Sequence, residues 1–411
     1  MVKRIFKKEK KNHNRLFLLC FNTVFRETAL NLGAYIMSLK YIAKNIDQRV
    51  ILCVSIMMTS ILFNMSIASA ASRYWIVPSG DWSTPSNWGG GEPTSSDSAL
   101  IHNSGTASIT LADEVCSSLV LGSPPMTSGS LNITSGSLTT TSAEIVGLYG
   151  TGTLTQSGGT NTYNGAVILG FSSGSRGTYN MSGGSLLTNS PNAIIIVGQG
   201  STGTFNQSGG YNAASAIGIS SMGTYNFTGG TLVVKSLNPG GYFNFGGGTL
   251  QAGTNFSTSR NMTLTGINGN ANVDTAGYSV TFSGGLTSQG GLNKVGTGTL
   301  TLSRAVFYNG ATTINGGGTL KISGGIPTGN TPLIDIINGT ALFDTTGINN
   351  AGLNIDIDAN GILNIGSTGS GYSVGYISGS GWIDLNQDLY CTGYDSGTLH
   401  INYNGFHIYT R

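Results

Sequence analysis

Charge is scarce in this sequence: Asp, Glu, Lys and Arg make up 9% of its 411 residues, against about 25% in an ordinary globular domain. Residues 1–72 carry 11 Lys/Arg and 3 Asp/Glu, a net charge of +8, whereas residues 73–411 carry 8 and 14, a net charge of −6. The longer part therefore lacks the basic surface that phosphate binding requires, and we expect no nucleic-acid partner. It is also too poor in charge to be a charged disordered segment.

Cysteine and histidine are scarce as well, with 4 of each in the chain. Only Cys116 and Cys391 lie beyond residue 72, and cysteines so far apart form neither a disulfide framework nor a paired-cysteine metal motif. We expect both as small buried side chains. His102, His400 and His407 are too scattered to indicate a metal centre. The sequence therefore predicts no metal site and no cofactor.

A nearly continuous apolar run, Val50–Phe63, follows three basic residues between positions 40 and 49 and precedes Ala68-Ser69-Ala70. This order of charged, apolar and small residues predicts a secretory signal that is cleaved near Ala70. An uncleaved membrane anchor is the alternative, but the run is shorter than the ~20 apolar residues that span a bilayer. We therefore expect an exported protein, secreted or at the cell surface, that meets a membrane only through this segment.

Glycine, by contrast, is abundant, with 64 residues, and one glycine-containing phrase recurs with its starts 23, 25, 26 and 20 residues apart. The copies are GSLNITSG (Gly129–Gly136), GTLTQSGG (Gly152–Gly159), GTYNMSGG (Gly177–Gly184), GTFNQSGG (Gly203–Gly210) and GTYNFTGG (Gly223–Gly230). A period of this length is typical of one supersecondary unit stacked on the next. Short alternating strands between glycine turns exclude helices. The sequence predicts an all-β fold, a right-handed parallel β-solenoid with coils of about 20–26 residues.

Stacking of such coils brings equivalent residues into rows about 4.8 Å apart. One row is a predicted amide ladder, for which we prefer side-chain pairing to glycosylation of its N-x-[ST] matches: Asn132, Asn180, Asn206 and Asn226. A second row is predicted to lie in the core: Leu131, Leu154, Tyr179, Phe205 and Tyr225. Gln207 belongs to a third, mixed row with Ile133, Gln156, Met181 and Phe227, which we expect near the edge of the core.

The segment Gly290–Ser323 is organised differently. It has a Gly-Gly-Leu-x-Lys opening at Gly290–Lys294, a Gly-Thr-Leu-Thr-Leu strand at Gly298–Leu302, an aromatic-x-Gly turn at Tyr308–Gly310 and a Gly-Thr-Leu return ending at Leu320. This stretch strongly resembles the autotransporter-associated β-strand repeat of exported bacterial passenger regions, from which it departs at residues 304–307. The resemblance implies a passenger-like secreted bacterial repeat protein.

These observations divide the chain into six expected segments. They are a basic extension with the secretory signal (1–70), a Trp-rich cap with the first coils (71–128), the Gly-Gly repeat solenoid (129–236), degenerate coils (237–289), the autotransporter-associated repeat (290–323) and C-terminal solenoid coils (324–411), with truncation at Arg411 left open.

Three of the 4 tryptophans, Trp75, Trp82 and Trp88, follow the signal within 14 residues, beside Asp81 and Glu92. They are the candidate carbohydrate-binding residues, because indole faces next to carboxylates suit sugar rings. The preferred interpretation is a cap that closes the first coil against edge-to-edge association. Similar tryptophan-bearing openings in secreted repeat proteins of this kind favour the cap.

The hexapeptide Asp356–Gly361 (DIDANG) imitates the first half of a calcium-binding loop. The twelfth position is Ser367 instead of Glu, and the flanking residues alternate like strands. A hairpin with a turn at Asn360-Gly361 explains the segment more simply. No metal ligand is therefore predicted.

Enzymes built on β-helices need clustered carboxylates, and between Glu114 and Asp274 the only one is Glu144. Sequence-distant pairs such as Asp274 and Asp335 could still meet across coils. The sequence predicts a non-enzymatic secreted or cell-surface protein that acts as a structural or adhesive solenoid. A carbohydrate-binding module on a solenoid stalk is the alternative, and a polysaccharide lyase or hydrolase is less favoured. Expected partners are extracellular polysaccharides or cell-surface components.

Overall fold

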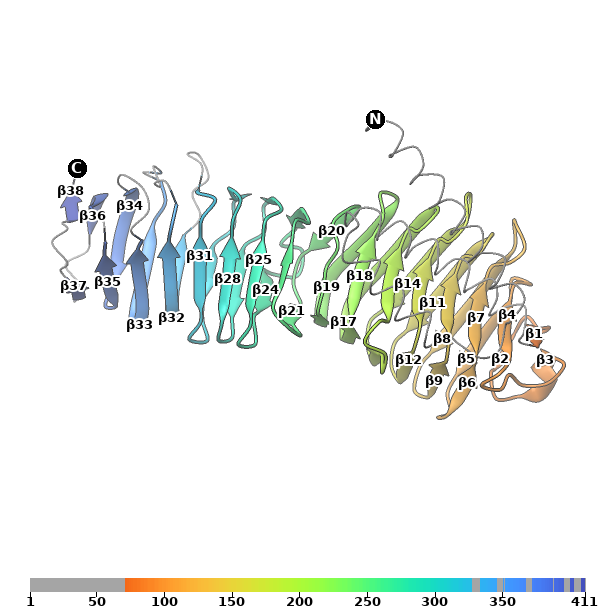
Figure 1. Cartoon of the computed structure of the whole chain (residues 1–411). Helices are drawn as coiled ribbons and strands as arrows, with labels where there is room; N and C mark the ends of the chain where they lie inside the picture. Colours follow the sequence, from red (N-terminus) through yellow and green to blue (C-terminus); the bar gives the residue numbers. More distant parts are fainter. Residues whose placement is uncertain are drawn as a thin grey trace, which may run out of the picture. The chain divides into compact units, whose positions relative to one another are not determined.

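Parallel strands follow one another in the same order from coil to coil throughout the structure (Figure 1). The computed structural model describes residues 71–326, 333–345, 350, 352–366, 372–386, 388–394, 400–402 and 408–410, so the predicted secretory signal lies outside the described residues. Ile67–Arg411 is one compact unit of about 14 coils of roughly 22 residues. The predicted β-solenoid is confirmed, while its handedness stays a prediction. In the described part of the chain, no helix has the length and apolar character needed to span a bilayer.

The first half of the solenoid has three rows of strands, which we call faces A, B and C, and each coil passes through them in turn. Face A comprises β1 (Ser72–Trp75), β4 (Ser98–Ile101), β7 (Ser118–Leu121), β10 (Ala143–Val146), β13 (Ala166–Leu169), β16 (Ile194–Val197) and β18 (Ala216–Ile219). Face B begins with β2 (Ser79–Asp81), β5 (Thr106–Ile109), β8 (Ser128–Ile133), β11 (Thr151–Gln156) and β14 (Arg176–Met181). Face C begins with β6 (Glu114–Cys116), β9 (Ser137–Thr140), β12 (Thr160–Tyr163) and β15 (Ser185–Leu187). Two longer strands, β17 (Thr202–Ala214) and β19 (Gly223–Val234), run through both B and C.

In the second half, face A is replaced by a new row, face D. It comprises β22 (Phe256–Thr258), β25 (Ser279–Phe282), β28 (Thr299–Leu302), β31 (Thr319–Ile322), the second parts of β32 (Ile334–Phe343) and β33 (Ile355–Ile365), β35 (Trp382–Leu385) and β37 (His400–Asn402). Face B continues with β20 (Tyr242–Phe245), β23 (Met262–Leu264), β26 (Leu286–Ser288) and β29 (Phe307–Tyr308). Face C continues with β21 (Thr249–Ala252), β24 (Ala271–Asp274), β27 (Leu292–Val295), β30 (Thr312–Ile314) and the first parts of β32 and β33. The last strands are β34 (Tyr372–Gly379), β36 (Leu389–Tyr394) and β38 (Ile408–Thr410).

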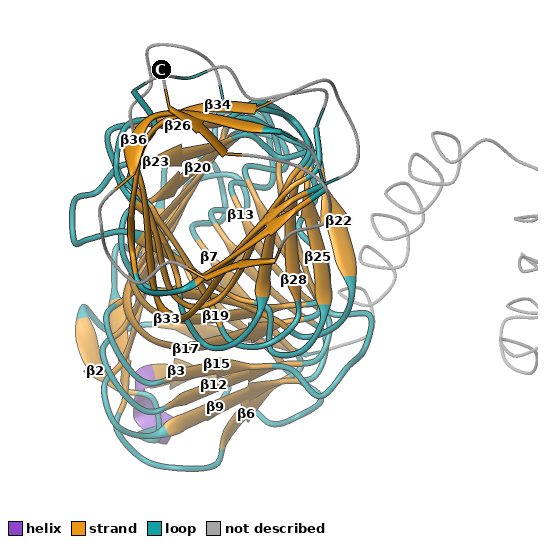
Figure 2. Cartoon of the chain, turned by 90° about the vertical axis from the view of Figure 1, so that its left-hand side faces the viewer, coloured by secondary structure: helices purple, strands orange, loops and turns teal. Residues whose placement is uncertain are grey.

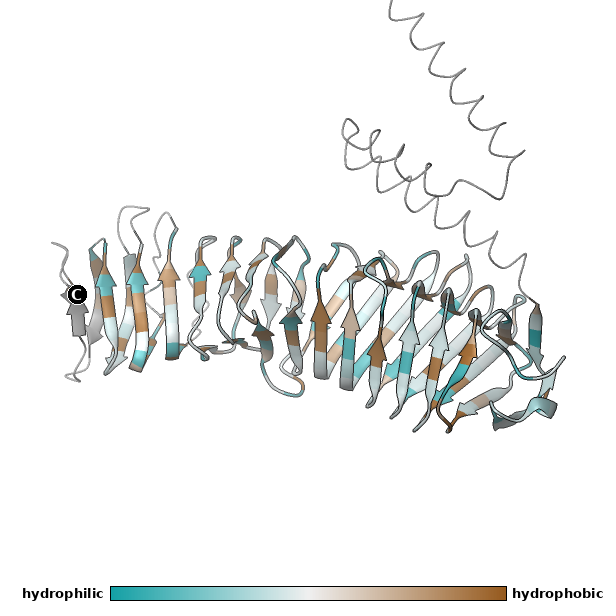
Figure 3. Ribbon diagram, turned by 60° about the horizontal axis from the view of Figure 1, so that its bottom comes forward, coloured by the Kyte–Doolittle hydropathy of each residue, from teal (hydrophilic) through white to brown (hydrophobic). Residues whose placement is uncertain are grey.

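Seen along its axis, each coil is a closed loop of strands joined by turns (Figure 2). Side chains alternate along each strand, so that in β14 Tyr179 and Met181 are buried while Thr178 and Asn180 lie toward solvent. In Figure 3, where the ribbon is coloured by hydropathy, the same alternation is visible as hydrophobic and hydrophilic bands along the strands. One continuous apolar core therefore runs the length of the described solenoid.

The glycines of the repeated phrase serve two different purposes. Gly184 and Gly210 have φ of +71° and +72°, which L side chains rarely adopt, and they turn the chain from face B to face C. Gly177 is different, because a Cβ there would overlap the carbonyl oxygen of Val146 in the preceding coil. The first glycine of the phrase is thus needed for close approach of two backbones.

The two halves join where face A stops, after an isolated bridge between Ile217 and Leu237. Arg260 fills this interruption: it is 1% exposed, and its guanidinium donates hydrogen bonds to the carbonyls of Asn238 and Gly240. Burial lowers the pKa of Arg260 to about 10. The backbone carbonyls left by the end of one sheet are therefore satisfied by a buried arginine.

Candidate functional site: the N-terminal cap and the repeat faces

The tryptophan cluster closes the first coil. After β1 and β2, a short 3-10 helix, Pro85–Asn87, leads into β3 (Trp88–Gly89). Strand β3 pairs antiparallel with β1, with Trp88 opposite Trp75, whereas every other strand pairing in the described structure is parallel. The reversed strand covers the free edge of face A, which would otherwise accept a strand from another chain.

All three indoles lie in the core, with exposed fractions of 1% for Trp75, 0% for Trp82 and 3% for Trp88. Trp88 packs edge-on against the other two rings, at centroid distances of 5.0 Å and 4.7 Å. Its Nε1 also donates a 2.8 Å hydrogen bond to the carbonyl of Trp82. No indole face is open to a sugar ring in this arrangement, which favours the cap. Sugar binding at these residues stays a prediction that would require the rings to leave the core.

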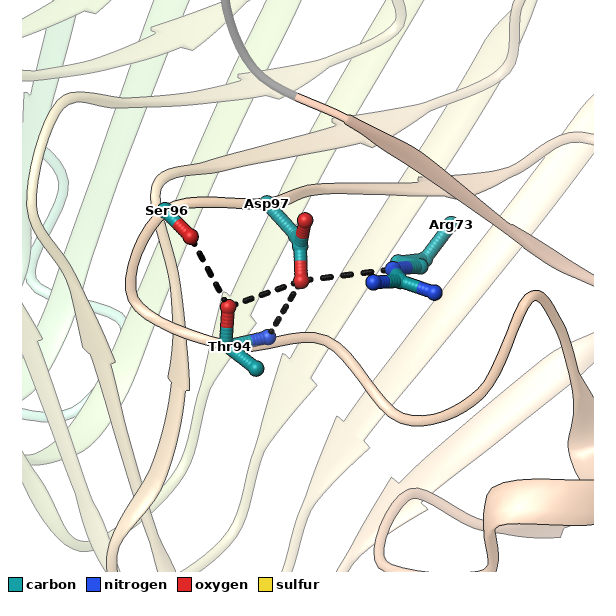
Figure 4. Close-up of polar contacts among 4 residues, drawn as sticks. All are labelled: Arg73, Thr94, Ser96 and Asp97. Atoms are coloured by element: carbon teal, nitrogen blue, oxygen red, sulfur yellow. Dashed lines mark hydrogen bonds and ion pairs between the residues drawn. The ribbon is translucent and has the colours of Figure 1, made fainter.

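Polar contacts hold the loop that follows β3 (Figure 4). Asp97 Oδ2 accepts hydrogen bonds from the backbone N–H of Thr94 at 3.1 Å and from its hydroxyl at 2.7 Å, and it lies 3.2 Å from Arg73 Nε on β1. Burial opposes ionisation of Asp97, but the Thr94 hydrogen bonds and the Arg73 guanidinium outweigh it and lower the pKa of the carboxyl. Asp97 therefore ties the loop to the first strand.

Asp81, one of the two acidic residues that the sequence places beside the tryptophans, also supports a turn. Its carboxylate accepts hydrogen bonds from the Ser83 hydroxyl at 2.6 Å and from the Thr110 hydroxyl at 2.5 Å. Burial opposes its ionisation, yet these hydrogen bonds lower the pKa of Asp81. The carboxylate is occupied by neighbouring groups of the chain and does not point at an open sugar site.

A carboxyl pair in the cap was missed by sequence reasoning. Glu114 on β6 is 5% exposed and hydrogen-bonded to Glu92, and burial followed by this contact raises the pKa of Glu114 to about 8. A second carboxyl in such contact disfavours the charged form of Glu114. The residues are 22 positions apart in sequence, and no pattern within one coil connects them. The described residues contain no group of three or more His, Cys, Asp or Glu that could hold a metal ion.

Trp82→Ala should destabilise the cap, because it removes a wholly buried ring and leaves a cavity that costs about 3–5 kcal/mol. We expect a lower melting temperature in circular dichroism. Trp382→Ala, at a tryptophan that is 41% exposed, is the matched control and should melt close to the wild type. An unchanged melting temperature with loss of glycan binding would instead support the sugar platform.

The predicted amide ladder runs along the outside of face B. Asn206 Nδ2 donates to Asn180 Oδ1 and Asn226 Nδ2 donates to Asn206 Oδ1, both at 2.8 Å. Asn244 extends the ladder by one coil, also at 2.8 Å. Asn132 shares the row, but Thr155 stands between it and Asn180. The ladder prediction is thus confirmed for three of its four members.

The outer surface beside the ladder has little charge and is rich in hydroxyl groups. Thr153, Thr178, Thr204 and Thr224 form a second row in strict register. Arg176 is the only charged residue in strands β8, β11, β14, β17 and β19. This face therefore presents amide and hydroxyl groups at the spacing of the strands, and it has no strong positive or negative electrostatic potential.

Inside the coils the predicted core row is confirmed, since Leu131, Leu154, Tyr179, Phe205 and Tyr225 are all 0% exposed. Phe205 stacks between Tyr179 and Tyr225 at centroid distances of 4.7 Å and 4.6 Å. The expectation for the neighbouring mixed row was wrong: Gln207 is also 0% exposed. Its Oε1 accepts a 2.6 Å hydrogen bond from the Tyr225 hydroxyl and its Nε2 donates to the Thr231 carbonyl at 3.0 Å.

This arrangement recurs two coils earlier. The Tyr179 hydroxyl donates to Gln156 Oε1 at 2.8 Å and accepts from Asn161 Nδ2 at 3.3 Å. In the later copy the Tyr225 hydroxyl accepts from Asn212 Nδ2 at 3.1 Å. A buried Asn–Tyr–Gln triad thus occurs at two coil interfaces of the described structure, which are separated by one interface without a triad.

The second half also buries a charge that the sequence did not place in the core. Lys294, in the Gly-Gly-Leu-x-Lys opening, is 0% exposed, and its Nζ donates to the carbonyls of Val295 at 3.0 Å and Gly296 at 2.6 Å. Burial lowers the pKa of Lys294 to about 8, against the opposing effect of Asp274. The lysine supports a turn from inside the coil.

The calcium-like hexapeptide lies within a single strand, so the predicted hairpin at Asn360-Gly361 was wrong. Strand β33 runs through it and pairs parallel with β32, with a register shift between Ile336 and Asn338. The Asn-Gly step bends the strand at a corner between faces C and D. A turn signal of this kind does not distinguish a hairpin from the corner of a solenoid.

The remaining sequence candidates do not gather into a site. Asp274 has Gln251 and Val295 as its register neighbours, and Asp335 has Thr313 and Asp356, so the two do not share a row. Cys116 and Cys391 are both buried, as predicted. His102 lies against Tyr74 at 5.7 Å, whereas His407 and the side chain of His400 fall outside the described residues.

No family model matches the chain, and no solved structure matches it significantly. A stretch of 108 residues is 35% identical to the "Adhesin BmaC autotransporter" of Brucella suis biovar 1 (strain 1330). The alignment covers 23% of this chain and 3% of the length of that adhesin. The chain is thus a β-solenoid with a short stretch similar to an autotransporter adhesin, which fits an autotransporter passenger-like protein. The specific β-strand repeat family at Gly290–Ser323 stays a prediction.

Proposed function

We propose that this chain is a non-enzymatic secreted or cell-surface protein whose solenoid acts as a structural and adhesive rod. The observation that carries the proposal is the long outer surface of face B, which has little charge and carries the asparagine ladder from Asn180 to Asn244. The similarity to an autotransporter adhesin supports it. The N-terminal segment ending near Ala70 would direct export.

The carboxylates of the cap support this proposal more than catalysis. Asp81 and Asp97 are each occupied by hydrogen bonds that fix turns. Glu114 shares its contact with Glu92 and is nearly inaccessible to solvent. Hydrolysis or elimination on a polysaccharide needs an acid and a base on either side of the substrate, in an open groove.

Polysaccharide is the partner class we favour. Sugar hydroxyls pair with amides and hydroxyls, and a neutral surface neither repels nor requires charge on its partner. Strand stacking repeats each outward side chain at about 4.8 Å. Many weak contacts along the rod would then add up through multivalency.

The test uses the compact unit from Ile67 onwards on a panel of polysaccharides. We expect saturable binding without release of reducing ends or unsaturated products. Thr178→Glu combined with Thr204→Glu, on the outer side of face B, should weaken binding. Thr281→Glu combined with Thr301→Glu, a register pair on the outer side of face D, is the matched control. Saturable hydrolysis or elimination would overturn the non-enzymatic assignment.

A second experiment addresses export. The full chain is expressed in a bacterial host, and the exported product is analysed by N-terminal sequencing. Processing near Ala70 is the expected result. A product retained in the cytoplasm with Met1 intact would contradict the proposed localisation.

A further inference from the structure

One core position of face A carries a carboxyl group. Glu144 on β10 is 0% exposed, and its register neighbours in the adjacent coils are Leu119 and Val167. Both of these are buried aliphatic residues, so a carboxyl replaces an alkyl side chain in an otherwise apolar row. Burying a carboxylate without a cation is costly, whereas a neutral carboxyl is tolerated if it is hydrogen-bonded.

The hydrogen-bond partners of Glu144 are neutral. Thr140 Oγ1 donates to Oε1 and Asn161 Nδ2 donates to Oε2, both at 3.0 Å. The ion pairs among the described residues are Arg73 with Asp97 and Lys321 with Asp344, and neither involves Glu144. Within the described part of the chain, the carboxyl therefore has no countercharge.

The titratable groups that face Glu144 are Cys116 on β6, Tyr163 on β12 and Tyr179 on β14. Burial, followed by proximity to Glu144, raises the pKa of each of them, so all three are uncharged near neutrality. Two buried oxygens of the same cluster, Asn161 Oδ1 and the Tyr163 hydroxyl, have no hydrogen-bond partner. The cluster thus contains one unused acceptor, Asn161 Oδ1, and one hydroxyl that can accept or donate, but no cation.

We propose that Glu144 is a pH-sensitive switch in the first half of the solenoid. With its proton it is a neutral member of the core, and the coils around it are closed. When the proton is lost, the carboxylate can be solvated only if these coils open, and the opening exposes Cys116. The proposal concerns the coils themselves and does not depend on the partner that the outer faces bind.

The direction of the effect follows from linkage. Burial raises the pKa of Glu144 from 4.5 to about 7, although the hydrogen bonds from Asn161 and Thr140 oppose this shift. The closed state therefore binds the proton more tightly than the open state, and its stability falls as pH rises from 4.5 to about 7 and is level above that. From these pKa values the open population should grow roughly 30-fold between pH 5.5 and pH 8.5.

The test measures alkylation of Cys116 in the Ile67–Arg411 unit with Cys391→Ala, so that one thiol remains. Each rate is divided by that of a small free thiol at the same pH, which removes the intrinsic pH dependence of thiolate formation. We expect the normalised rate to rise about 30-fold between pH 5.5 and pH 8.5. Glu144→Gln should abolish the rise, and Asp358→Asn, a matched change at an exposed carboxyl, should leave it intact.

Two outcomes would overturn the proposal. One is a normalised rate in the unmodified Glu144 background that does not change with pH. The other is the same pH dependence in Glu144→Gln as in that background. If Glu144→Gln does not fold, Glu144→Leu replaces it, because leucine is the side chain found at the register neighbour Leu119. Loss of the pH dependence in Glu144→Leu supports the switch, and its persistence excludes Glu144 as the cause.

Discussion

Phe205→Asp should unfold the coils around β17 at a temperature well below that of the wild type. Phe205 is 0% exposed, and its ring stacks on Tyr179 in one neighbouring coil and on Tyr225 in the other. The substitution removes both contacts and buries a carboxylate without a cation. Combined cavity and charge effects of this kind cost about 4 kcal/mol or more. Because each coil is held by its neighbours, the loss should spread to β14 and β19.

The matched control is Thr204→Asp, one residue earlier on the same strand and on its outer side. It introduces the same carboxylate into solvent and should shift the melting temperature little. Gln207→Asp should also be harmful, since it breaks the hydrogen bonds to Tyr225 and Thr231. Equal and small melting shifts for Phe205→Asp and Thr204→Asp would show that the inside and the outside of face B have been assigned wrongly.

Gly177→Ala should be nearly as damaging, although it adds a single methyl group. The added Cβ would overlap the carbonyl oxygen of Val146 and the backbone nitrogen of Gly170, and backbone atoms in a packed coil cannot give way separately. Overpacking of a core typically costs about 1–3 kcal/mol, and we expect the upper end or more because two backbones must separate. Differential scanning calorimetry of the Ile67–Arg411 unit provides the measurement.

Gly218→Ala is the control for this change. Gly218 also lies in a strand, but the atom nearest to a Cβ there is 3.8 Å away, an ordinary contact. Alanine at such a position should be neutral or stabilise by about 0.4–1 kcal/mol through the unfolded chain. If both variants lose the same stability, the effect comes from glycine content in general and not from the close approach at Gly177.

The repeated phrase was sufficient to predict the coils, the asparagine ladder and the aromatic row. Those features depend on a period of two along each strand and on one residue recurring from coil to coil. Tyr179 and Phe205 could be placed inside because equivalent positions in five copies are large and apolar or aromatic. At these positions the place in the strand, the residue type and the repetition from coil to coil all indicate a buried side chain, and the side chains are buried in the structure.

Residues whose partners lie in another coil could not be placed in this way. Gln207 was expected near the edge of the core because its row is mixed, yet the Tyr225 hydroxyl that satisfies it is 18 residues further on. Arg260 is buried for a similar reason, since its hydrogen-bond acceptors are backbone carbonyls 20 and 22 residues earlier, at an interruption. Lys294 is a different case, because its acceptors are the carbonyls of the next two residues, and the local turn brings them to its Nζ. A sequence pattern shows which side chains are polar, but it does not show which carbonyls remain unpaired.

The N-terminal cap was only partly predictable. The spacing of Trp75, Trp82 and Trp88 indicated a cluster, but the sequence left open whether the rings face solvent or one another. The orientation of the rings depends on the antiparallel pairing of β3 with β1. The contact between Glu92 and Glu114 depends on the same return.

The Asn–Tyr–Gln triads make successive coil interfaces in the first half of the solenoid alternate between two kinds, with and without a triad. Gln156 and Asn161 in one coil serve Tyr179 in the next, and Gln207 and Asn212 serve Tyr225. Deleting a single coil would place Gln156 and Asn161 against a ring without a hydroxyl, leaving buried polar atoms unpaired. Deleting two consecutive coils would bring them against Tyr225 and restore the pairing. Insertions and deletions in this region should therefore be tolerated better when they comprise two coils than when they comprise one. The pair of coils is then the unit by which the length of this region can change.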